Sequence, residues 1–331
     1  MFKDISVVVQ GPVQALVDRN QEEGITQRCL RSVREHLPGA KIILSTWYDQ
    51  DLDGLDYDEL VLCQDPGHNI RQYNRDGSPH YFNNNRQIVS TAEGLKKVKT
   101  KYAVKLRSDN YLTNNDFVEY QKKYDVFGDA HRYFNQRVVV SDIFTRKFAK
   151  GLSVPLHISD FFYFGLTSDL LSLWDLPLEK DYIPSQALPF DASDPYHLVD
   201  CTQLFVLKSL KKIGEKFDLK HLHDKSIVGT KISEEFIANN LIILGETQLG
   251  LGLPSKFKGN TRVSKLKGKC SHYQFFEWEL LYKKYSYRDY KVEIDFFYLA
   301  RIHIARLCYI YPRSLETIFN IYKRKYFRGL S

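Results

Sequence analysis

The feature that most constrains this sequence is the alternation of short apolar runs with helical patterns in its first third. Apolar, often β-branched runs occupy residues 5–9, 41–47, 60–63 and 102–106, and residues 26–36 and 84–97 between them have helical periodicity. Strands that alternate with helices predict a mainly parallel sheet with helices on both faces. In such sheets ligands bind beyond the carboxyl ends of the strands. That rule singles out the polar segments at residues 10–12, 65–68 and 107–110.

The middle of the chain gives a mixed pattern. Residues 67–83 are polar and rich in Gly, Pro and Asn, which predicts a long loop over the sheet edge. Residues 159–165 predict a buried strand, residues 167–174 a helix with Thr167 as its N-cap, and residues 199–213 another helix. The apolar run at residues 236–244 fits either a last strand or a helix.

From about residue 256 onward the composition changes. Residues 256–269 carry many Lys and Arg with little apolar periodicity, and residues 275–327 are dense in Tyr, Phe, Lys and Arg. We therefore predict two parts: an α/β domain over residues 1–260 and a helical, basic and aromatic region over residues 261–331.

The segment from Lys105 to Asn110 carries the strongest chemical signal. A hydrophobic strand delivers Asp109 to the carboxyl edge of the sheet, beside the cations Lys105 and Arg107. Such a set can neutralise a diphosphate directly, or through Mg²⁺ or Mn²⁺ held by the carboxylate. A turn in which Asp109 caps the next helix gives the same pattern, so spacing alone leaves both interpretations open.

Several common enzyme classes lack support. The chain contains no G-x-S-x-G nucleophile elbow, no G-x-x-x-x-G-K-[ST] phosphate loop, and no G-x-G-x-x-G after the first strand. Five widely spaced cysteines without a C-x-x-C pair predict reduced thiols rather than disulfides or structural zinc: Cys29, Cys63, Cys201, Cys270 and Cys308.

A set of motifs in order and spacing resembles the WavE lipopolysaccharide-synthesis family, within the GT-A glycosyltransferase clan. The matching pieces are Val7-Val8-Val9-Gln10-Gly11-Pro12, Ser45-Thr46-Trp47, Asp65-Pro66-Gly67, residues 84–91 with Gly94-Leu95, and residues 101–109. The resemblance is strongest over the first third of the chain and weakens toward residue 256. It implies a GT-A fold, in which one Rossmann-like, mainly parallel sheet binds a nucleotide-sugar donor.

The resemblance also implies roles for residues of the donor site. Gln10, Gly11 and Pro12 would lie beneath the base and ribose, Asp65 would meet the base or ribose, and Asn85 and Arg86 would lie by the sugar or phosphates. Asp109 stands where the last acid of the Asp-x-Asp metal motif stands. Arg107 replaces the first acid, which leaves both Mn²⁺ or Mg²⁺ binding and direct pairing of Arg107 with phosphate open.

Further residues are candidates for catalysis or metal binding. An inverting enzyme needs a carboxylate that removes a proton from the acceptor hydroxyl. Asp200, at a helix N-terminus, and Asp160, which opens the predicted strand before Gly165, are the first choices, and Glu234 and Glu235 are others. Asp200 is equally explained as a residue that stabilises its own helix. The clan's late metal-binding His has three candidates, of which His272 is preferred over His221 and His223, and Lys256 is a candidate for diphosphate contact.

The net charge of +7 suits nucleic acid, anionic lipid or anionic substrates. Because the basic residues cluster late among aromatic ones, we expect the tail to lie on an anionic membrane, where a glycolipid acceptor would be found, and we expect no nucleic-acid partner. A helical cap with a solvated basic face is the alternative for the tail. The chain shows no export signal and no run of about 18 apolar residues, which predicts a cytoplasmic protein, peripheral on the inner face of the cytoplasmic membrane.

The prediction is a glycosyltransferase that moves a sugar from a nucleotide-sugar to a lipopolysaccharide or capsular polysaccharide acceptor. The alternative is a catalytically inactive GT-A-like module that binds glycolipid or a partner transferase, which the missing first acid would permit.

Overall fold

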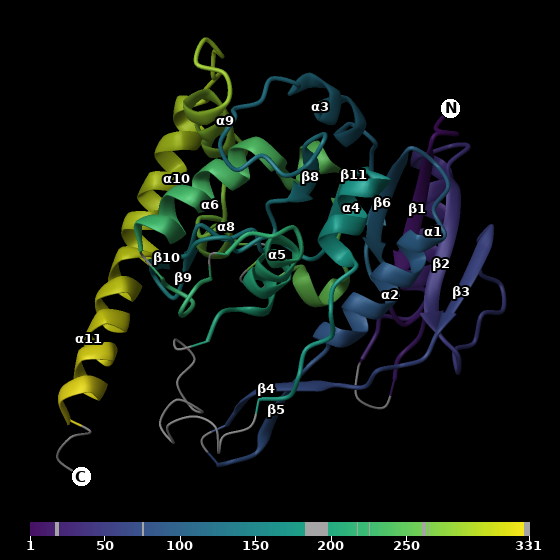
Figure 1. Ribbon diagram of the computed structural model, residues 1–331, viewed down its shortest axis with the longest axis horizontal. Helices are drawn as coiled ribbons and strands as arrows, with labels where there is room; N and C mark the ends of the chain where they lie inside the picture. The colour runs from purple at the N-terminus through teal and green to yellow at the C-terminus, as the bar shows by residue number, and fades with distance from the viewer. Residues whose placement is uncertain are drawn as a thin grey trace.

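The protein is built around one seven-stranded sheet (Figure 1). The computed structural model describes residues 1–16, 20–74, 76–182, 198–216, 218–224, 226–259, 263 and 265–327, without the side chains of residues 227–229 and 324–327. The strand order is β12-β8-β11-β6-β1-β2-β3, and β11 alone runs antiparallel to its neighbours. The bounds are β1 Ile5–Gln10, β2 Lys41–Trp47, β3 Glu59–Cys63, β6 Tyr102–Arg107, β8 Val138–Ser141, β11 Phe162–Leu166 and β12 Leu241–Leu244.

Helices cover both faces of this sheet. Along β11, Phe162 and Phe164 contact the ring of Phe117 in α3 (Phe117–Lys123), whereas Tyr163 contacts Trp174 in α4 (Thr167–Trp174). Because successive strand residues point to opposite faces, α3 and α4 lie on opposite sides. The prediction of an α/β fold with a mainly parallel sheet is confirmed, and the central strands are buried on both faces, as their continuous apolar runs require.

Helix α2 (Asn84–Lys96) packs especially closely on the sheet. A Cβ added at Gly94 would lie 2.3 Å from Val8 Cγ1 and 3.0 Å from Ser45 Cβ. The missing side chain at Gly94 therefore lets the helix approach β1 and β2. Helix α1 (Ile25–His36) begins after Gly24 and contacts β1 and the short strand β7 (Tyr111–Leu112).

The segment predicted as a loop over residues 67–83 is instead a two-stranded hairpin. Strands β4 (Asn69–Tyr73) and β5 (Pro79–Phe82) pair with each other and project away from the main sheet (Figure 1). The hairpin is supported from far along the chain, because the Ile70 N–H donates to Asp181 Oδ1 and the Ile70 carbonyl accepts from Tyr182 N. The polar sequence of this segment predicted a loop because the contacts that stabilise the two strands come from residues distant in the sequence.

Two smaller predictions also need correction or completion. Helix α4 does begin at Thr167, but Leu166 is its N-cap and the Thr167 hydroxyl donates to the Thr100 carbonyl. The run at 236–244 contains both predicted structures: α6 (Ile227–Asn240) ends where β12 begins. The side chain of Asn240 accepts hydrogen bonds from the Tyr133 and Phe134 N–H groups, which fixes that junction against the neighbouring segment.

The C-terminal region is helical, as predicted, and lies along one side of the molecule (Figure 1). It comprises α8 (Leu266–Lys269), α9 (Phe275–Tyr285), α10 (Phe296–Tyr309) and α11 (Tyr311–Phe327). The division near residue 260 remains a prediction; Trp278 and Tyr282 of α9 lie in the same hydrophobic core as the sheet. In α10, Arg306 donates to both carboxylate oxygens of Glu277, which ties this helix to α9.

All five cysteines carry free thiols. Among the helices that the structure describes, none combines the length and the apolar character needed to span a bilayer.

Candidate functional site

A small pocket lies where β1, β2 and β6 end at their carboxyl termini, roofed by the first turns of α2. We call it the donor pocket. Its lining residues are Gln10, Gly11, Pro12, Trp47, Arg86, Gln87, Ser90, Arg107, Ser108 and Asp109. Predicted donor residues from three separate segments thus share one pocket at the carboxyl edge of the parallel strands, where ligands bind in such sheets.

The floor of the pocket is held by a tight turn. Gly11 has φ +113°, a conformation that L side chains rarely adopt, and a Cβ there would lie 3.1 Å from Ser108 Oγ. The Ser108 hydroxyl donates to the Pro12 carbonyl at 2.6 Å, and the Ser90 hydroxyl donates to Gln10 Oε1 at 2.7 Å. The ends of β1 and β6 and the helix α2 are therefore fixed to one another by side chains.

Arg86 forms one cationic wall. Its Nε and Nη2 donate to the two oxygens of Asp65 at 2.8 and 2.7 Å, and its Nη1 donates to Asn83 Oδ1 at 3.0 Å. A forked guanidinium–carboxylate pair of this kind is fixed in orientation as well as in charge. Asp65 follows β3, so the pair connects the third strand to α2.

Arg107 and Asp109 form the other wall. Arg107 Nε and Nη2 donate to the two Asp109 oxygens, each at 2.9 Å, and Nη1 lies 3.4 Å from Asp160 Oδ2. Lys256, in the 3-10 turn Ser255–Phe257, donates to Asp109 Oδ2 at 2.8 Å. Burial raises the pKa of Asp109, but Arg107 and Lys256 lower it more, so its pKa lies well below the usual range. Asp109 is therefore ionised and shared between two cations.

Two polar atoms at the donor pocket lack hydrogen-bond partners among the described residues. Trp47 Nε1 and Gln87 Oε1 are both shielded from solvent and unsatisfied. Buried polar atoms are normally paired, so an unpaired donor and acceptor at one pocket point to a ligand that supplies both. The predictions from sequence did not assign Trp47, Gln87, Ser90 or Ser108 to the site, although Trp47 ends a strand at this edge and Ser90 lies one helical turn from Arg86.

Four predicted donor residues are not among the lining residues of the donor pocket. Asp65 and Lys256 contact the lining residues Arg86 and Asp109, whereas Lys105 and Asn85 bind other segments of the chain. Lys105 is fully buried, donates to the Asp160 carbonyl, and lies 4.3 Å from the centre of the Trp174 ring. Burial lowers the pKa of Lys105 to about 7, against the opposing effect of Asp160. Asn85 exchanges hydrogen bonds with the backbone of Glu179 through its side-chain amide. The side chains of Lys105 and Asn85 thus bind other segments of the chain and do not line the donor pocket.

The two preferred catalytic carboxylates occupy different places. Asp160 touches Arg107 and so adjoins the donor pocket. Asp200 is the N-cap of α5 (Cys201–Lys212), with a complete capping box formed with Gln203, and it lines a separate pocket with Arg71 and Cys201. Burial raises the pKa of Asp200, but His157 and Thr202 lower it to about 2, so the carboxylate is ionised. Its side chain is 39% exposed.

The alternative carboxylates serve ion pairs on α6. Glu234 accepts from Lys284 and from the Tyr285 hydroxyl, and Glu235 pairs with His131 and Lys231. None of these partners lines the donor pocket.

The preferred His ligand is not beside Asp109. His272 is buried, and its ring contacts Phe144, which in turn packs against Phe257. Burial lowers the pKa of His272 to about 3. Of the other candidates, His221 Nδ1 accepts from the His223 N–H. Among the described residues no group of three His, Cys, Asp or Glu side chains is arranged to hold a metal ion, and both Asp109 oxygens are already engaged by cations. The side chains that the structure describes thus do not fit a metal held by the protein alone.

A mainly parallel sheet with a pocket of paired cations and carboxylates at its carboxyl edge places the protein in the α/β class. The comparison with protein families is more specific: the chain belongs to the WavE family, whose model, described as lipopolysaccharide synthesis, matches residues 5–311. This match confirms the resemblance and extends it beyond the first third, through α8, α9 and α10 to the start of α11. No curated protein matches the chain in sequence.

Solved structures give distant likenesses. The crystal structure of S. aureus TarS 1-349 aligns at 14% identity and TM-score 0.33, covering 62% of this chain and 54% of that one, so the chain spans about half of that structure. HddC from Yersinia pseudotuberculosis aligns at 11% identity and TM-score 0.30, covering 56% and 84%. The 4-diphosphocytidyl-2C-methyl-D-erythritol synthase from Anaerococcus prevotii aligns at 14% identity and TM-score 0.32, covering 70% and 95%. Likenesses at this level carry no argument about activity.

Proposed function

We propose that the protein is a glycosyltransferase that uses a nucleotide-sugar donor and acts on a lipopolysaccharide or capsular acceptor. Membership of a lipopolysaccharide-synthesis family supports the process. The observation that carries the reaction type is the donor pocket, where Arg86, Arg107 and Lys256 meet a Gly11 turn and unsatisfied polar atoms at the carboxyl edge of the sheet.

The most exposed cation in contact with Asp109 is Lys256. Its side chain is 45% exposed, whereas Arg107 and Asp109 are 13% and 2% exposed. Lys256 can therefore turn from Asp109 to a diphosphate while Arg107 still donates to both oxygens of Asp109. Positive charge placed where the leaving phosphate gains negative charge lowers the barrier to transfer. Because Arg107 and Lys256 already neutralise Asp109, the proposed transfer needs no metal held by the protein. The titrations with Mn²⁺, Mg²⁺ and EDTA below test this point.

Asp160 and Asp200 are the two candidates for the base that removes the proton from the acceptor hydroxyl. Asp160 adjoins the donor pocket through Arg107. Asp200 is ionised and more accessible, next to His157. Asp160→Asn and Asp200→Asn, compared at saturating donor, separate them, because loss of the base lowers kcat.

The test of the donor pocket is nucleotide binding by the full chain. UDP, GDP, CDP and CMP are each titrated with Mn²⁺, with Mg²⁺ and with EDTA while the melting temperature is followed. A nucleotide at about 100 times its Kd adds about 2.7 kcal/mol of stability. Lys256→Met should weaken binding of that nucleotide, and Lys211→Met, an exposed lysine of α5, is the matched control.

The results of these titrations distinguish an active glycosyltransferase from an inactive binding module. Binding of one nucleotide that depends on Lys256, followed by hydrolysis or transfer of the matching nucleotide-sugar, supports the transferase. Binding without turnover in the presence of acceptor supports the inactive module that binds glycolipid or a partner enzyme. No binding under any condition refutes the donor pocket.

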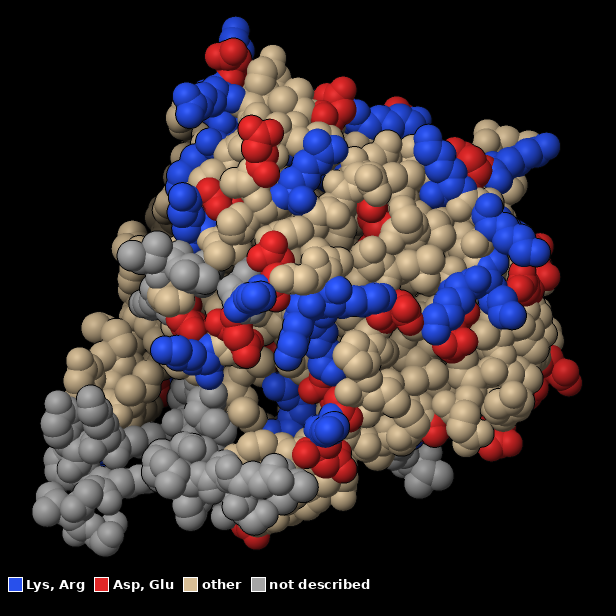
Figure 2. Space-filling view, in the orientation of Figure 1, with Lys and Arg blue, Asp and Glu red and all other residues tan. Residues whose placement is uncertain are grey.

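We also propose that α10 and α11 rest on an anionic membrane surface at the cytoplasmic face. An exposed apolar stripe runs along both helices at spacings of three, four and seven residues: Phe297, Ile304, Leu307, Tyr311, Leu315, Phe319 and Tyr322. Phe297 is 90% exposed. Such a helix face buries its apolar side chains in the headgroup boundary, and basic neighbours add about 1 kcal/mol each. Elsewhere on the face seen in Figure 2, Lys and Arg lie interspersed with Asp and Glu rather than in one basic track for nucleic acid.

Vesicle sedimentation tests this surface. Wild-type protein should sediment with vesicles containing phosphatidylglycerol and much less with phosphatidylcholine alone. The triple variant Phe297→Ser, Leu315→Ser, Phe319→Ser should stay in the supernatant, whereas Tyr48→Ser, which removes an exposed aromatic residue outside the C-terminal region, should not differ from wild type. Equal sedimentation of all three proteins contradicts the proposal.

A further inference from the structure

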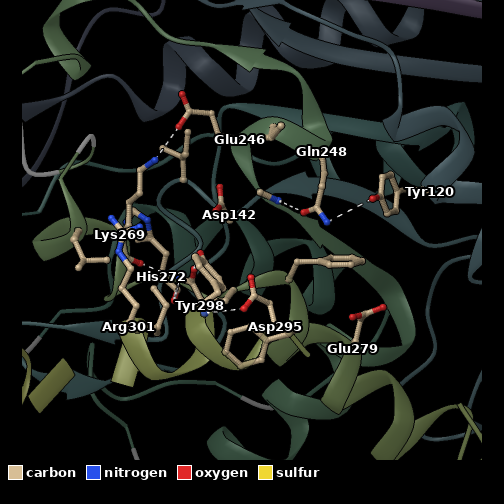
Figure 3. A pocket seen from close by; sticks show the side chains of 18 of the residues that line it. Tyr120, Asp142, Glu246, Gln248, Lys269, His272, Glu279, Asp295, Tyr298 and Arg301 are labelled. Atoms are coloured by element: carbon tan, nitrogen blue, oxygen red, sulfur yellow. Dashed lines mark hydrogen bonds and ion pairs between the residues drawn. The ribbon is translucent and has the colours of Figure 1, made fainter. Parts of the chain in front are cut away.

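A second, larger cavity of about 670 Å³ lies beyond the carboxyl ends of β8 and β12, at the other end of the same sheet edge (Figure 3). We call it the distal pocket. Asp142 directly follows β8, and Gly245 and Glu246 directly follow β12. Helices α9 and α10 close its far side with Phe275, Phe276 and Tyr298 among others. Its volume falls in the range of small-molecule sites, about 300–1,000 Å³.

Asp142 is the unusual group of the distal pocket. Its Oδ1 is shielded from solvent and accepts no hydrogen bond from any described residue. Burial raises the pKa of Asp142 to about 7, against the lowering effect of Lys269. An unsatisfied carboxylate oxygen costs the fold stability, so its presence points to a ligand that donates to it. Figure 3 shows Asp142 between Glu246, Lys269 and Tyr298, which come from three other segments.

The other polar groups of the distal pocket are oriented by neighbours. Glu246 pairs with Lys269 at 3.1 Å, and the Tyr298 hydroxyl donates to Gln274. Gln248 Oε1 accepts from the Gly245 N–H at 3.2 Å. These contacts hold carboxylate, amide and phenol groups in place around the cavity before any ligand enters.

The composition of the lining selects the ligand class. Five carboxylates face three cations, which disfavours a phosphate: Asp142, Glu246, Glu279, Glu293 and Asp295 against Lys123, Lys269 and Arg301. The described residues offer no three-ligand cluster for a metal. Carboxyl oxygens accept hydrogen bonds, whereas a sugar hydroxyl both donates and accepts them. Phe275 and Phe276 supply aromatic surface to the same cavity. A polyhydroxylated ring meets all of these groups.

The distal pocket also leads toward the donor pocket. A neighbouring hollow of about 280 Å³ shares Glu246 and Lys269 with it and extends to Phe257 and Lys258. These two residues directly follow Lys256, which binds Asp109. Resting on the function proposed above, we infer that the distal pocket binds a sugar residue of the acceptor oligosaccharide, with Asp142 accepting from a hydroxyl group, while the acceptor's reactive end reaches the donor pocket.

The experiment measures carbohydrate binding without any nucleotide. The probe is the core oligosaccharide released from a rough-type lipopolysaccharide by mild acid and freed of phosphate, titrated into the full chain and followed by saturation-transfer NMR. Asp142→Ala removes the acceptor of the hydroxyl group, and Thr247→Trp places a ring at the rim of the pocket. Ser168→Trp, at an exposed position in the first turn of α4, is the size control.

We expect wild type and Ser168→Trp to bind and Thr247→Trp to show no transfer. Asp142→Ala should bind about ten-fold more weakly, as the loss of one hydrogen bond predicts. The inference is overturned if wild type shows no transfer, or if Asp142→Ala and Thr247→Trp both bind like wild type. Melting temperatures identify a variant that fails to fold, and the other variant then decides. Lys256→Met should bind the oligosaccharide normally, so a failed donor pocket and a failed distal pocket give different results.

Discussion

Replacing Asp109 by Asn tests how the two walls of the donor pocket depend on charge. The change keeps the size of the side chain but removes the carboxylate that receives two hydrogen bonds from Arg107, each at 2.9 Å, and one from Lys256. Because Arg107 is almost buried, it would be left with Asp160, 3.4 Å away, as its remaining carboxylate. Removing one partner of a buried pair costs about 3–5 kcal/mol. Since Asp160 still compensates part of the charge, we expect a loss near the lower value, about 3 kcal/mol.

Urea unfolding followed by tryptophan fluorescence measures this loss, because Trp47, Trp174 and Trp278 are all buried. The matched variant is Lys256→Met, which breaks the exposed half of the same network and should cost at most about 1 kcal/mol. Equal losses for the two variants, or a loss below about 1 kcal/mol for Asp109→Asn, would refute the reasoning. If Asp109→Asn does lose about 3 kcal/mol of stability, a loss of nucleotide binding in that variant could result from destabilisation of the pocket. For this reason the nucleotide-binding experiment uses Lys256→Met instead.

Three further predictions concern the surrounding structure. Burial raises the pKa of Asp142 to about 7, so the folded state binds this proton more tightly than the unfolded state, and stability falls as the pH rises from about 4 to 7. In urea unfolding, Asp142→Asn should therefore be up to about 4 kcal/mol more stable than wild type at pH 8 and little different at pH 4. A difference that does not depend on pH contradicts this prediction. Gly94→Ala should lower stability by about 1–3 kcal/mol despite the helix preference of Ala, because its Cβ would meet Val8. Adding Val8→Ala to this variant should partly restore its melting temperature, and additive losses from the two substitutions argue against a clash. Arg86→Lys should cost about 1–2 kcal/mol in urea unfolding, since one ammonium cannot reproduce the forked pair with Asp65, and a loss within error would show that the pair is not held rigidly.

The amino-acid sequence is sufficient to predict the sheet and one edge of the site. The strands predicted at residues 41–47 and 60–63 lie within a residue of their observed bounds, because their apolar runs are continuous and end in turn residues. The rule that ligands bind beyond the carboxyl ends of parallel strands selects Gln10 and Asp109 from the sequence alone, and these residues do share a pocket.

What could not be predicted depends on contacts between distant segments. Lys105 has the sequence context of a phosphate ligand, yet it points into the core because Asp160 and Trp174 lie over that face of β6. Strands β4 and β5 are supported by Asp181, which lies 111 residues after Ile70 in the chain. The distal pocket joins Asp142 to helices more than a hundred residues further on, and no local motif marks it.

The pairing of ions in the donor pocket has a thermodynamic consequence. Three cations are matched by three carboxylates: Arg86, Arg107 and Lys256 by Asp65, Asp109 and Asp160. Counted over these described residues, the charges cancel, and a diphosphate that binds there adds negative charge. If the proposed nucleotide-sugar binds here, we expect an exchange, in which either Lys256 leaves Asp109 for the phosphate or the nucleotide carries its own cation into the site. The two routes differ in stoichiometry: in the first the affinity for the nucleotide is independent of the magnesium concentration, and in the second the affinity rises with it.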